Sequence, residues 1–200
     1  MTSDTSPPTG KDQQEAAMRG RPRDTERTEA ILDATHKVLH SQGWHDLRVA
    51  DIAREAGCGL ATIYRRWGTK EELVAAAVTN RPLPPAAETG DPRTDLHNLV
   101  VAVVDEMAAM GESVIGFLAA TQAEPILRDA FQKTIMTVTR PRIGGYLAAI
   151  LDDDGPQTEL LIDAIGGALL MRIGVLGQQP DPAEFADGIL ALVDRMTANS

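Results

Sequence analysis

Residues 49–73 read VADIAREAGCGLATIYRRWGTKEEL and decide how the chain folds. Apolar residues at helical spacing predict one short helix over residues 49–56 and another over residues 60–67. Gly57-Cys58-Gly59 separates them, and two glycines in three residues favour a tight turn with backbone angles that other residues avoid. Two short helices joined by a three-residue turn have the proportions of a helix-turn-helix.

The second of these helices presents two chemically different faces. A turn of about 100° per residue places one set inward, Leu60, Ile63 and Trp67. It places Ala61, Thr62 and Arg65 on the opposite side, with Tyr64 and Arg66 on the flanks. The outward face is small, hydroxyl-bearing and basic, which is what a helix needs to read the major groove of DNA.

Each outward residue suits a defined contact with DNA. Arg65 can donate both arms of its guanidinium to O6 and N7 of guanine, and Ala61 can approach a thymine methyl group. Donors to phosphate are expected from Thr62, Tyr64 and Arg66. Lys70 begins the next helix, where free N–H groups and the helix dipole also favour a phosphate.

The rest of the chain also predicts helices, and no stretch shows the sustained alternation of a strand. The first helix is expected from Thr25 to a stop at Gly43, burying Ile31, Ala34, Val38 and Leu39. Capping signals start three later helices: Thr69 with Glu72, Asp91 before Pro92, and Asp181 with Glu184. The further helices are expected over residues 113–121, 125–150 with a kink at Pro141, 157–177 and 182–197. The fold class is therefore all-α.

Charge separates the chain into parts with different partners. The net charge is −10, but residues 19–70 hold 10 Lys and Arg against 7 Asp and Glu. A local basic face binds a polyanion whatever the total charge of the chain. Residues 1–18 are polar and are expected to be disordered. The basic arm that follows (Arg19, Arg21 and Arg23 around Gly20 and Pro22) is either a solubility tail or an AT-hook-like arm for the minor groove.

Three ordered motifs make the comparison with a known family specific. They are IAREAG at residues 52–57, ATIYRRW at 61–67 and TKEEL at 69–73. Together they resemble the DNA-binding domain of the TetR/AcrR family of transcriptional regulators, over roughly residues 25–80. By this resemblance Thr62, Tyr64 and Lys70 contact the phosphate backbone, and residues 61 and 65 read bases. Arg48 and Gly59 stand where the family often has Thr and Ser, so Arg48 is expected to make a charged phosphate contact.

The resemblance implies three parts: an arm over residues 1–23, a three-helix DNA-binding domain over 24–80 with its helix-turn-helix at about 48–67, and a helical effector-binding and dimerisation domain over 81–200. A Pro-rich linker joins the two domains at residues 82–85. The expected function is a repressor that binds a palindromic operator as a homodimer and is released by a small molecule. The alternatives are an activator of the same fold, or a helical enzyme or ligand-sequestering protein.

Two further sets of residues are candidates in the second domain. Adaptable side chains at helical spacing are candidates for an effector pocket: Met107, Met110, Phe117, Phe131, Met136 and Met171. Small and apolar residues of the last two helices are candidates for a dimer interface built as a four-helix bundle: Gly166, Gly167, Leu169, Ile189, Leu192, Val193 and Met196.

Several classes of protein are not expected. A lone cysteine, Cys58, excludes a disulfide framework and a thiolate zinc site, and it fits a cytoplasmic protein. No apolar run approaches the ~20 residues of a membrane span. His36 and His40 are interpreted as a surface or domain-interface pair rather than metal ligands, and residues 152–155 (DDDG) as a solvated turn. No catalytic arrangement or nucleotide-binding motif stands out, so neither an enzyme nor a cofactor is expected.

Overall fold

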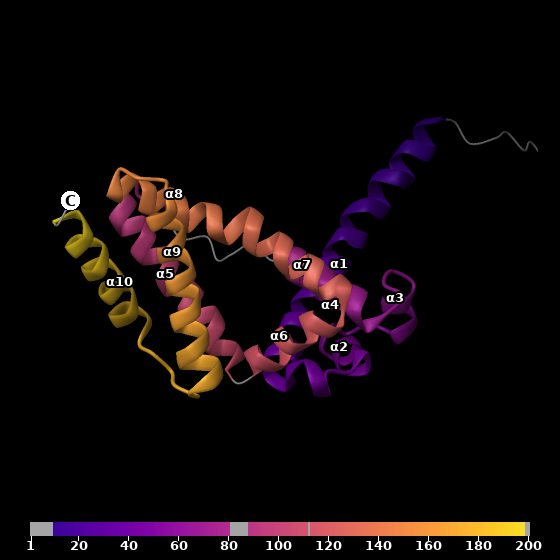
Figure 1. The fold of residues 1–200 in the computed structure, drawn as a ribbon. Helices are drawn as coiled ribbons and strands as arrows, with labels where there is room; N and C mark the ends of the chain where they lie inside the picture. The colour runs from indigo at the N-terminus through magenta and orange to yellow at the C-terminus, as the bar shows by residue number, and fades with distance from the viewer. Residues whose placement is uncertain (1–9, 81–87, 112, 199–200) are drawn as a thin grey trace, which may run out of the picture.

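The computed structural model describes residues 10–80, 88–111 and 113–198, with side chains described from residue 24 onward. Every regular element in these ranges is a helix, which confirms the all-α prediction (Figure 1). The elements are α1 (Gly10–Asp46), α2 (Val49–Glu55), α3 (Leu60–Tyr64), α4 (Lys70–Asn80), α5 (Pro92–Met110), α6 (Ser113–Ala123), α7 (Pro125–Thr134), the π-helical η1 (Ile135–Thr139), α8 (Arg140–Leu151), α9 (Pro156–Leu169), the π-helical η2 (Leu170–Val175) and α10 (Pro182–Thr197).

The first hydrophobic core joins the four N-terminal helices to α6 and α7. Its buried residues from α1–α4 include Ile31, Ile52, Ile63 and Leu73, and its buried residues from the later helices include Phe117 and Leu127. Helix α6 packs on α1, and α7 packs on α4. We call this unit the head. Its core crosses the boundary after residue 80 that the sequence predicts, because two helices of the second domain complete it.

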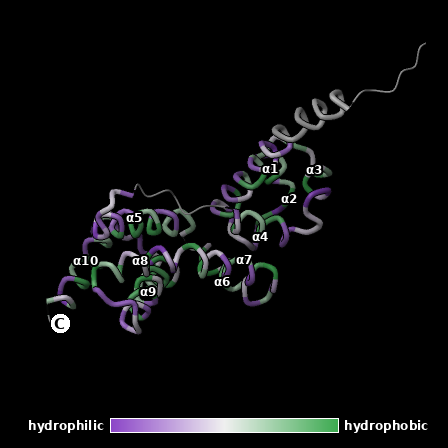
Figure 2. The backbone as a smooth tube through the Cα atoms, turned by 90° about the horizontal axis from the view of Figure 1, so that it is seen from above, coloured by the Kyte–Doolittle hydropathy of each residue, from purple (hydrophilic) through white to green (hydrophobic). Residues whose placement is uncertain are grey.

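The second hydrophobic core lies at the other end of the molecule. It is formed by α5, α8, α9, η2 and α10, with buried residues that include Leu96, Leu147, Ile165, Leu169 and Val193. Helix α10 packs mainly against α5. Figure 2 shows α6 and α7 between α1–α4 and the helices of the second core.

The predicted signals for helix ends are largely confirmed. Gly43 has a φ of 72° and interrupts α1 near its C-terminal end. The side chains of Asp91 and Asp181 each accept a hydrogen bond from the backbone N–H three residues later, at 3.0 and 2.8 Å. The Thr69 hydroxyl accepts from the N–H of Glu72 at 3.1 Å. The Glu72 carboxylate accepts from Gly68 rather than from Thr69, so the capping box is shifted by one residue.

Two helices end or begin at other residues than predicted, and a π-helical segment lies at the predicted kink. Helix α1 begins at Gly10, so residues 10–23 are helical and not a disordered arm; residues 11–18 (KDQQEAAM) are strong helix formers without an apolar stripe to reveal them. Residues 1–9 and the Pro-rich linker lie outside the described residues. Helix α3 ends at Tyr64, although Trp67 still donates to the Ile63 carbonyl at 2.9 Å. The π-helical η1 stands just before Pro141, which has no N–H for the carbonyl four residues earlier.

Candidate nucleic-acid interface

The turn between α2 and α3 has the geometry of a helix-turn-helix. Gly57 has a φ of 62°, in the left-handed region that favours glycine. The N–H of Cys58 donates back to the carbonyl of Ala53 at 2.9 Å, which closes the end of α2. Buried Ile52 and Ile63 then join the two helices to the core of the head. The local sequence therefore sets the turn, and the core sets the angle at which α3 leaves it.

Helix α3 presents the predicted outward face. Ala61 and Arg65 are exposed, Tyr64 is 50% exposed and Thr62 is half-buried. The inward face differs from the prediction at one position, since Leu60 is 43% exposed and not buried. Leu60 is the first residue of α3, where the helix has only begun to approach the core. The base-reading candidates are thus accessible from solvent.

Arg66, predicted to donate to phosphate, is engaged inside the protein. Its Nε donates to the hydroxyl of Thr28 at 3.3 Å, and its Nη2 donates to the carboxylate of Asp24. Both partners lie on α1, about forty residues earlier in the chain. The side chain is only 16% exposed, so its charge is directed toward α1.

Lys70 is also turned inward. Its Nζ donates to the carbonyls of Trp44 at 2.9 Å and Leu47 at 3.2 Å, and lies 4.0 Å from the centroid of the Trp44 ring. Burial lowers the pKa of Lys70, and the neighbouring carboxylate of Glu71 opposes that shift. Two of its three N–H donors are therefore occupied by the end of α1, and a phosphate contact would have to use the third.

The remaining DNA-binding candidates lie around the helix-turn-helix. Arg48 precedes α2 with an extended backbone, and its side chain is exposed. Its carbonyl accepts from the N–H of Asp51 at 3.0 Å, so its backbone, rather than its side chain, starts the helix. Arg19, Arg21 and Arg23 lie on the N-terminal part of α1, and their side chains lie outside the described set.

The six predicted pocket residues are not brought together. Phe117 and Phe131 meet edge to face, with centroids 5.9 Å apart, in the core of the head, and Met110 packs against the same core. Met107 packs against the second core. Met136 and Met171 are exposed.

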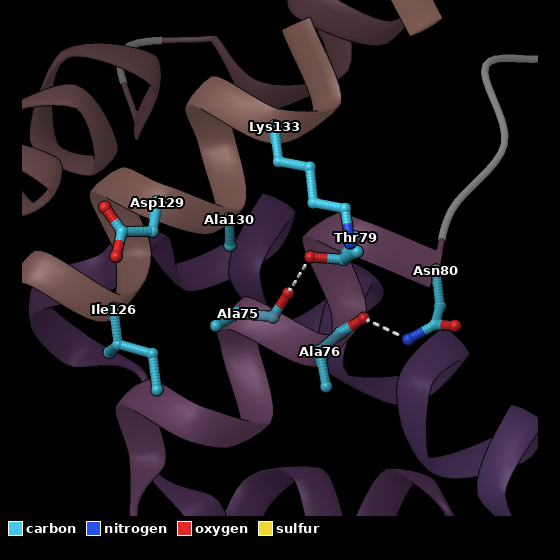
Figure 3. Close-up of a pocket in the computed structure, with 8 residues that line it drawn as sticks. All are labelled: Ala75, Ala76, Thr79, Asn80, Ile126, Asp129, Ala130 and Lys133. Carbon is cyan, nitrogen blue, oxygen red and sulfur yellow. Dashed lines mark hydrogen bonds between the residues drawn. The ribbon is translucent and has the colours of Figure 1, made fainter. Parts of the chain in front are cut away.

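Two hollows lie elsewhere on the described surface. The first, of about 370 Å³, lies between α4 and α7 (Figure 3). We call it the α4–α7 groove; its lining is Ala75, Ala76, Thr79, Asn80, Ile126, Asp129, Ala130 and Lys133. The second, of about 490 Å³, lies between η1, α8 and the start of α9, and it includes Met136. Neither hollow could be predicted from the sequence, because each depends on how helices pack against one another.

The predicted dimer residues divide into two groups. Leu169 and Val193 are fully buried within the chain, so the prediction that they form a dimer interface is wrong. Their apolar character serves the second core. Gly166, Gly167 and Leu192 are exposed, and Ile189 and Met196 are half-buried. Within the chain, α10 packs mainly on α5.

The histidines lie at contacts between helices. His36 Nε2 is 3.0 Å from the carbonyl oxygen of Ala77, and His40 Nε2 is 3.2 Å from the Glu106 carboxylate. The second contact joins α1 to α5. Among residues with described side chains, no group of three His, Cys, Asp or Glu could hold a metal ion. None of the described helices is long and apolar enough to span a membrane.

Comparison with known proteins agrees with this geometry. Residues 31–77 match the family described as bacterial regulatory proteins of the tetR family, and residues 86–193 match the tetracyclin repressor-like C-terminal domain. An HTH-type transcriptional regulator of Mycobacterium tuberculosis is 29% identical over 181 residues, 86% of this chain and 85% of its own. The regulator AqdR of Rhodococcus erythropolis is 24% identical over 172 residues, 83% of each chain.

Solved structures share the fold. A TetR transcription regulator of Haloarcula marismortui has a TM-score of 0.67 and 21% identity, covering 86% of this chain and 98% of its own. FadR of Bacillus subtilis, solved in complex with stearoyl-CoA, has a TM-score of 0.61 and 19% identity, covering 82% and 96%. With a helix-turn-helix that presents Ala61, Tyr64 and Arg65 outward and with family matches over both domains, the chain belongs to the TetR family and is a helix-turn-helix transcriptional regulator.

Proposed function

We propose that this regulator is a repressor that binds an inverted-repeat operator as a homodimer and leaves it when a small molecule binds. The observation that carries the proposal is the exposed face of α3, where Ala61, Tyr64 and Arg65 lie together on the head. A helix this short reads only a few base pairs, so two heads related by a two-fold axis are needed to select a site. Its DNA target would place the protein in the cytoplasm, and the family gives no reason to expect an enzyme.

The second copy of the chain would dock on the outer face of α9 and η2. Leu160, Gly167, Met171 and Val175 follow one another there at spacings of seven, four and four residues, which keeps them on one side. Leu160 is 70% exposed and Val175 is 61% exposed. Leu192 adds an exposed apolar side chain from α10. This face replaces Leu169 and Val193, which the core of the chain uses.

The effector would act at the α4–α7 groove. Helix α4 connects the helix-turn-helix to the second domain, and the Thr134 hydroxyl on α7 lies 3.4 Å from the carbonyl of Val78 on α4. In Figure 3, Lys133 points from α7 toward Thr79 across the groove. A molecule that fits between these helices would favour one arrangement of α4 over another, which is what release from DNA requires.

The function is tested by selecting bound fragments from genomic DNA and footprinting the site. The expected result is protection of an inverted repeat, with a reporter gene behind that site repressed by the protein. Reporter activation would identify an activator of the same fold, and failure to bind any DNA sequence preferentially would refute the proposed function.

The effector site is tested with Ala76→Phe, which fills the groove at a half-buried position. Once screening has found a molecule that releases the wild type from its operator, this variant should bind the operator and ignore that molecule. Normal release of the variant would place the effector elsewhere.

A further inference from the structure

Arg65 and Arg66 directly follow the last residue of α3, yet their side chains have opposite environments. Arg65 is exposed to solvent, whereas Arg66 is held against α1 by Asp24 and Thr28. The hydroxyl of Thr28 accepts from Arg66 and donates to the carbonyl of Asp24 at 2.8 Å. Arg66, Asp24 and Thr28 therefore form a hydrogen-bonded cluster that joins the C-terminal end of α3 to α1. We call this cluster the Asp24 lock.

Stability alone does not account for the lock. The Asp24 side chain is 71% exposed while that of Arg66 is 16% exposed, so solvent screens the carboxylate and the ion pair contributes only modestly to folding. Its effect on DNA binding is larger, because a protein–DNA complex gains affinity from each cation that meets a phosphate. A carboxylate that holds a guanidinium removes one such cation and places a negative charge beside the reading helix.

We propose that Asp24 withholds Arg66 from the DNA backbone and makes it a positioning residue, which orients the end of α3 so that Arg65 reads bases. The lock would then lower affinity for random DNA and leave sequence reading to the outward face. This inference rests on the proposed function, since it needs α3 to bind DNA. It differs from the prediction that Arg66 donates to phosphate.

The salt dependence of binding to a random-sequence duplex tests the lock in the full chain. Asp24→Asn should release Arg66 and add one phosphate contact per head, so that log K falls more steeply with log salt by about 0.9 per head. Between 50 and 200 mM salt, that change corresponds to about a 3.5-fold greater loss of affinity for each head. Asp24→Glu keeps the charge and should behave as the wild type.

Glu26→Gln is the matched control for charge. Glu26 is exposed on the same helix, and its replacement removes one negative charge without breaking the contact to Arg66. It should raise affinity slightly at low salt without making the slope steeper. Equal slopes for Asp24→Asn and Glu26→Gln would refute the lock.

Arg66→Gln completes the test. With Asp24 present, this change should leave the slope unaltered, and in the Asp24→Asn background it should abolish the added steepness. A shallower slope for Arg66→Gln alone would show that Arg66 meets a phosphate in the complex and would overturn the proposal. Failure of the wild type to bind any duplex would instead refute the proposed function, so the two failures are distinguishable.

Discussion

Replacing Lys70 with Met separates a structural role for this residue from a role in DNA binding. The change keeps most of the side chain's apolar length and removes the ammonium that donates to the carbonyls of Trp44 and Leu47. It also removes the cation from above the Trp44 ring. The end of α1 would then lose its connection to the start of α4, within the head that carries α3.

The size of the effect follows from these contacts. A hydrogen bond to a charged group contributes about 1.5–3 kcal/mol, and a cation over an aromatic ring adds about 0.5–1 kcal/mol at exposed sites. Burial lowers the pKa of Lys70, so desolvation of the ammonium offsets part of this gain. We therefore expect a loss of about 2 kcal/mol, which corresponds to about 4–8 °C in Tm for a chain of this size.

Urea unfolding followed by tryptophan fluorescence measures this loss directly. The chain has two tryptophans, and Trp44 touches Lys70 itself. Lys37→Met is the control, because Lys37 forms an exposed ion pair with Glu55 and should cost less than about 1 kcal/mol. Wild-type stability of Lys70→Met together with weakened DNA binding would refute the structural role of Lys70. It would indicate that Lys70 only binds phosphate.

Four further outcomes are expected. Arg65→Ala should lose about 1–3 kcal/mol of operator affinity and relax specificity at one base position per half-site, as measured by selection from random sequences. Deleting residues 1–23 removes the N-terminal part of α1 with Arg19, Arg21 and Arg23, and it should weaken binding to operators with A·T and with G·C flanks alike, because residues 10–23 are helical and not an extended arm for the minor groove. A larger loss for A·T flanks, measured by anisotropy, would favour the minor-groove role instead. Leu192→Glu should fold and sediment as a monomer that no longer binds the operator, whereas Val193→Glu should fail to fold, because it buries a charge in the second core. Hydrogen bonds, led by that from the backbone N–H of Thr89, lower the pKa of buried Asp95 below its ordinary 3.8. The contribution of Asp95 to the free energy of unfolding is therefore complete above pH 3.8 and disappears as the pH falls through the lowered pKa. In an acid titration, the difference in stability between wild type and Asp95→Asn should disappear over that pH range.

Features that depend only on neighbouring residues could be predicted from the sequence. The helix-turn-helix follows from apolar spacing and from Gly57, whose positive φ needs no information from the rest of the chain. The starts of α5 and α10 follow from Asp91 and Asp181, because a capping side chain binds a backbone N–H only three residues away. The outward face of α3 follows from helical geometry alone.

Features that depend on a distant partner could be seen only in the folded chain. Periodicity shows that Val193 is apolar on one face of a helix, but not whether that face meets its own chain or a second copy. The sequence also could not predict that α6 and α7 complete the core of the head, because they meet α1 and α4 only in the folded chain. Arg66 and Lys70 show the limit most clearly for function: both are basic residues in a DNA-binding motif, and sequence alone assigns both to phosphate. Their actual partners are 42 and 26 residues away, and a charged side chain takes whichever acceptor the fold brings within reach.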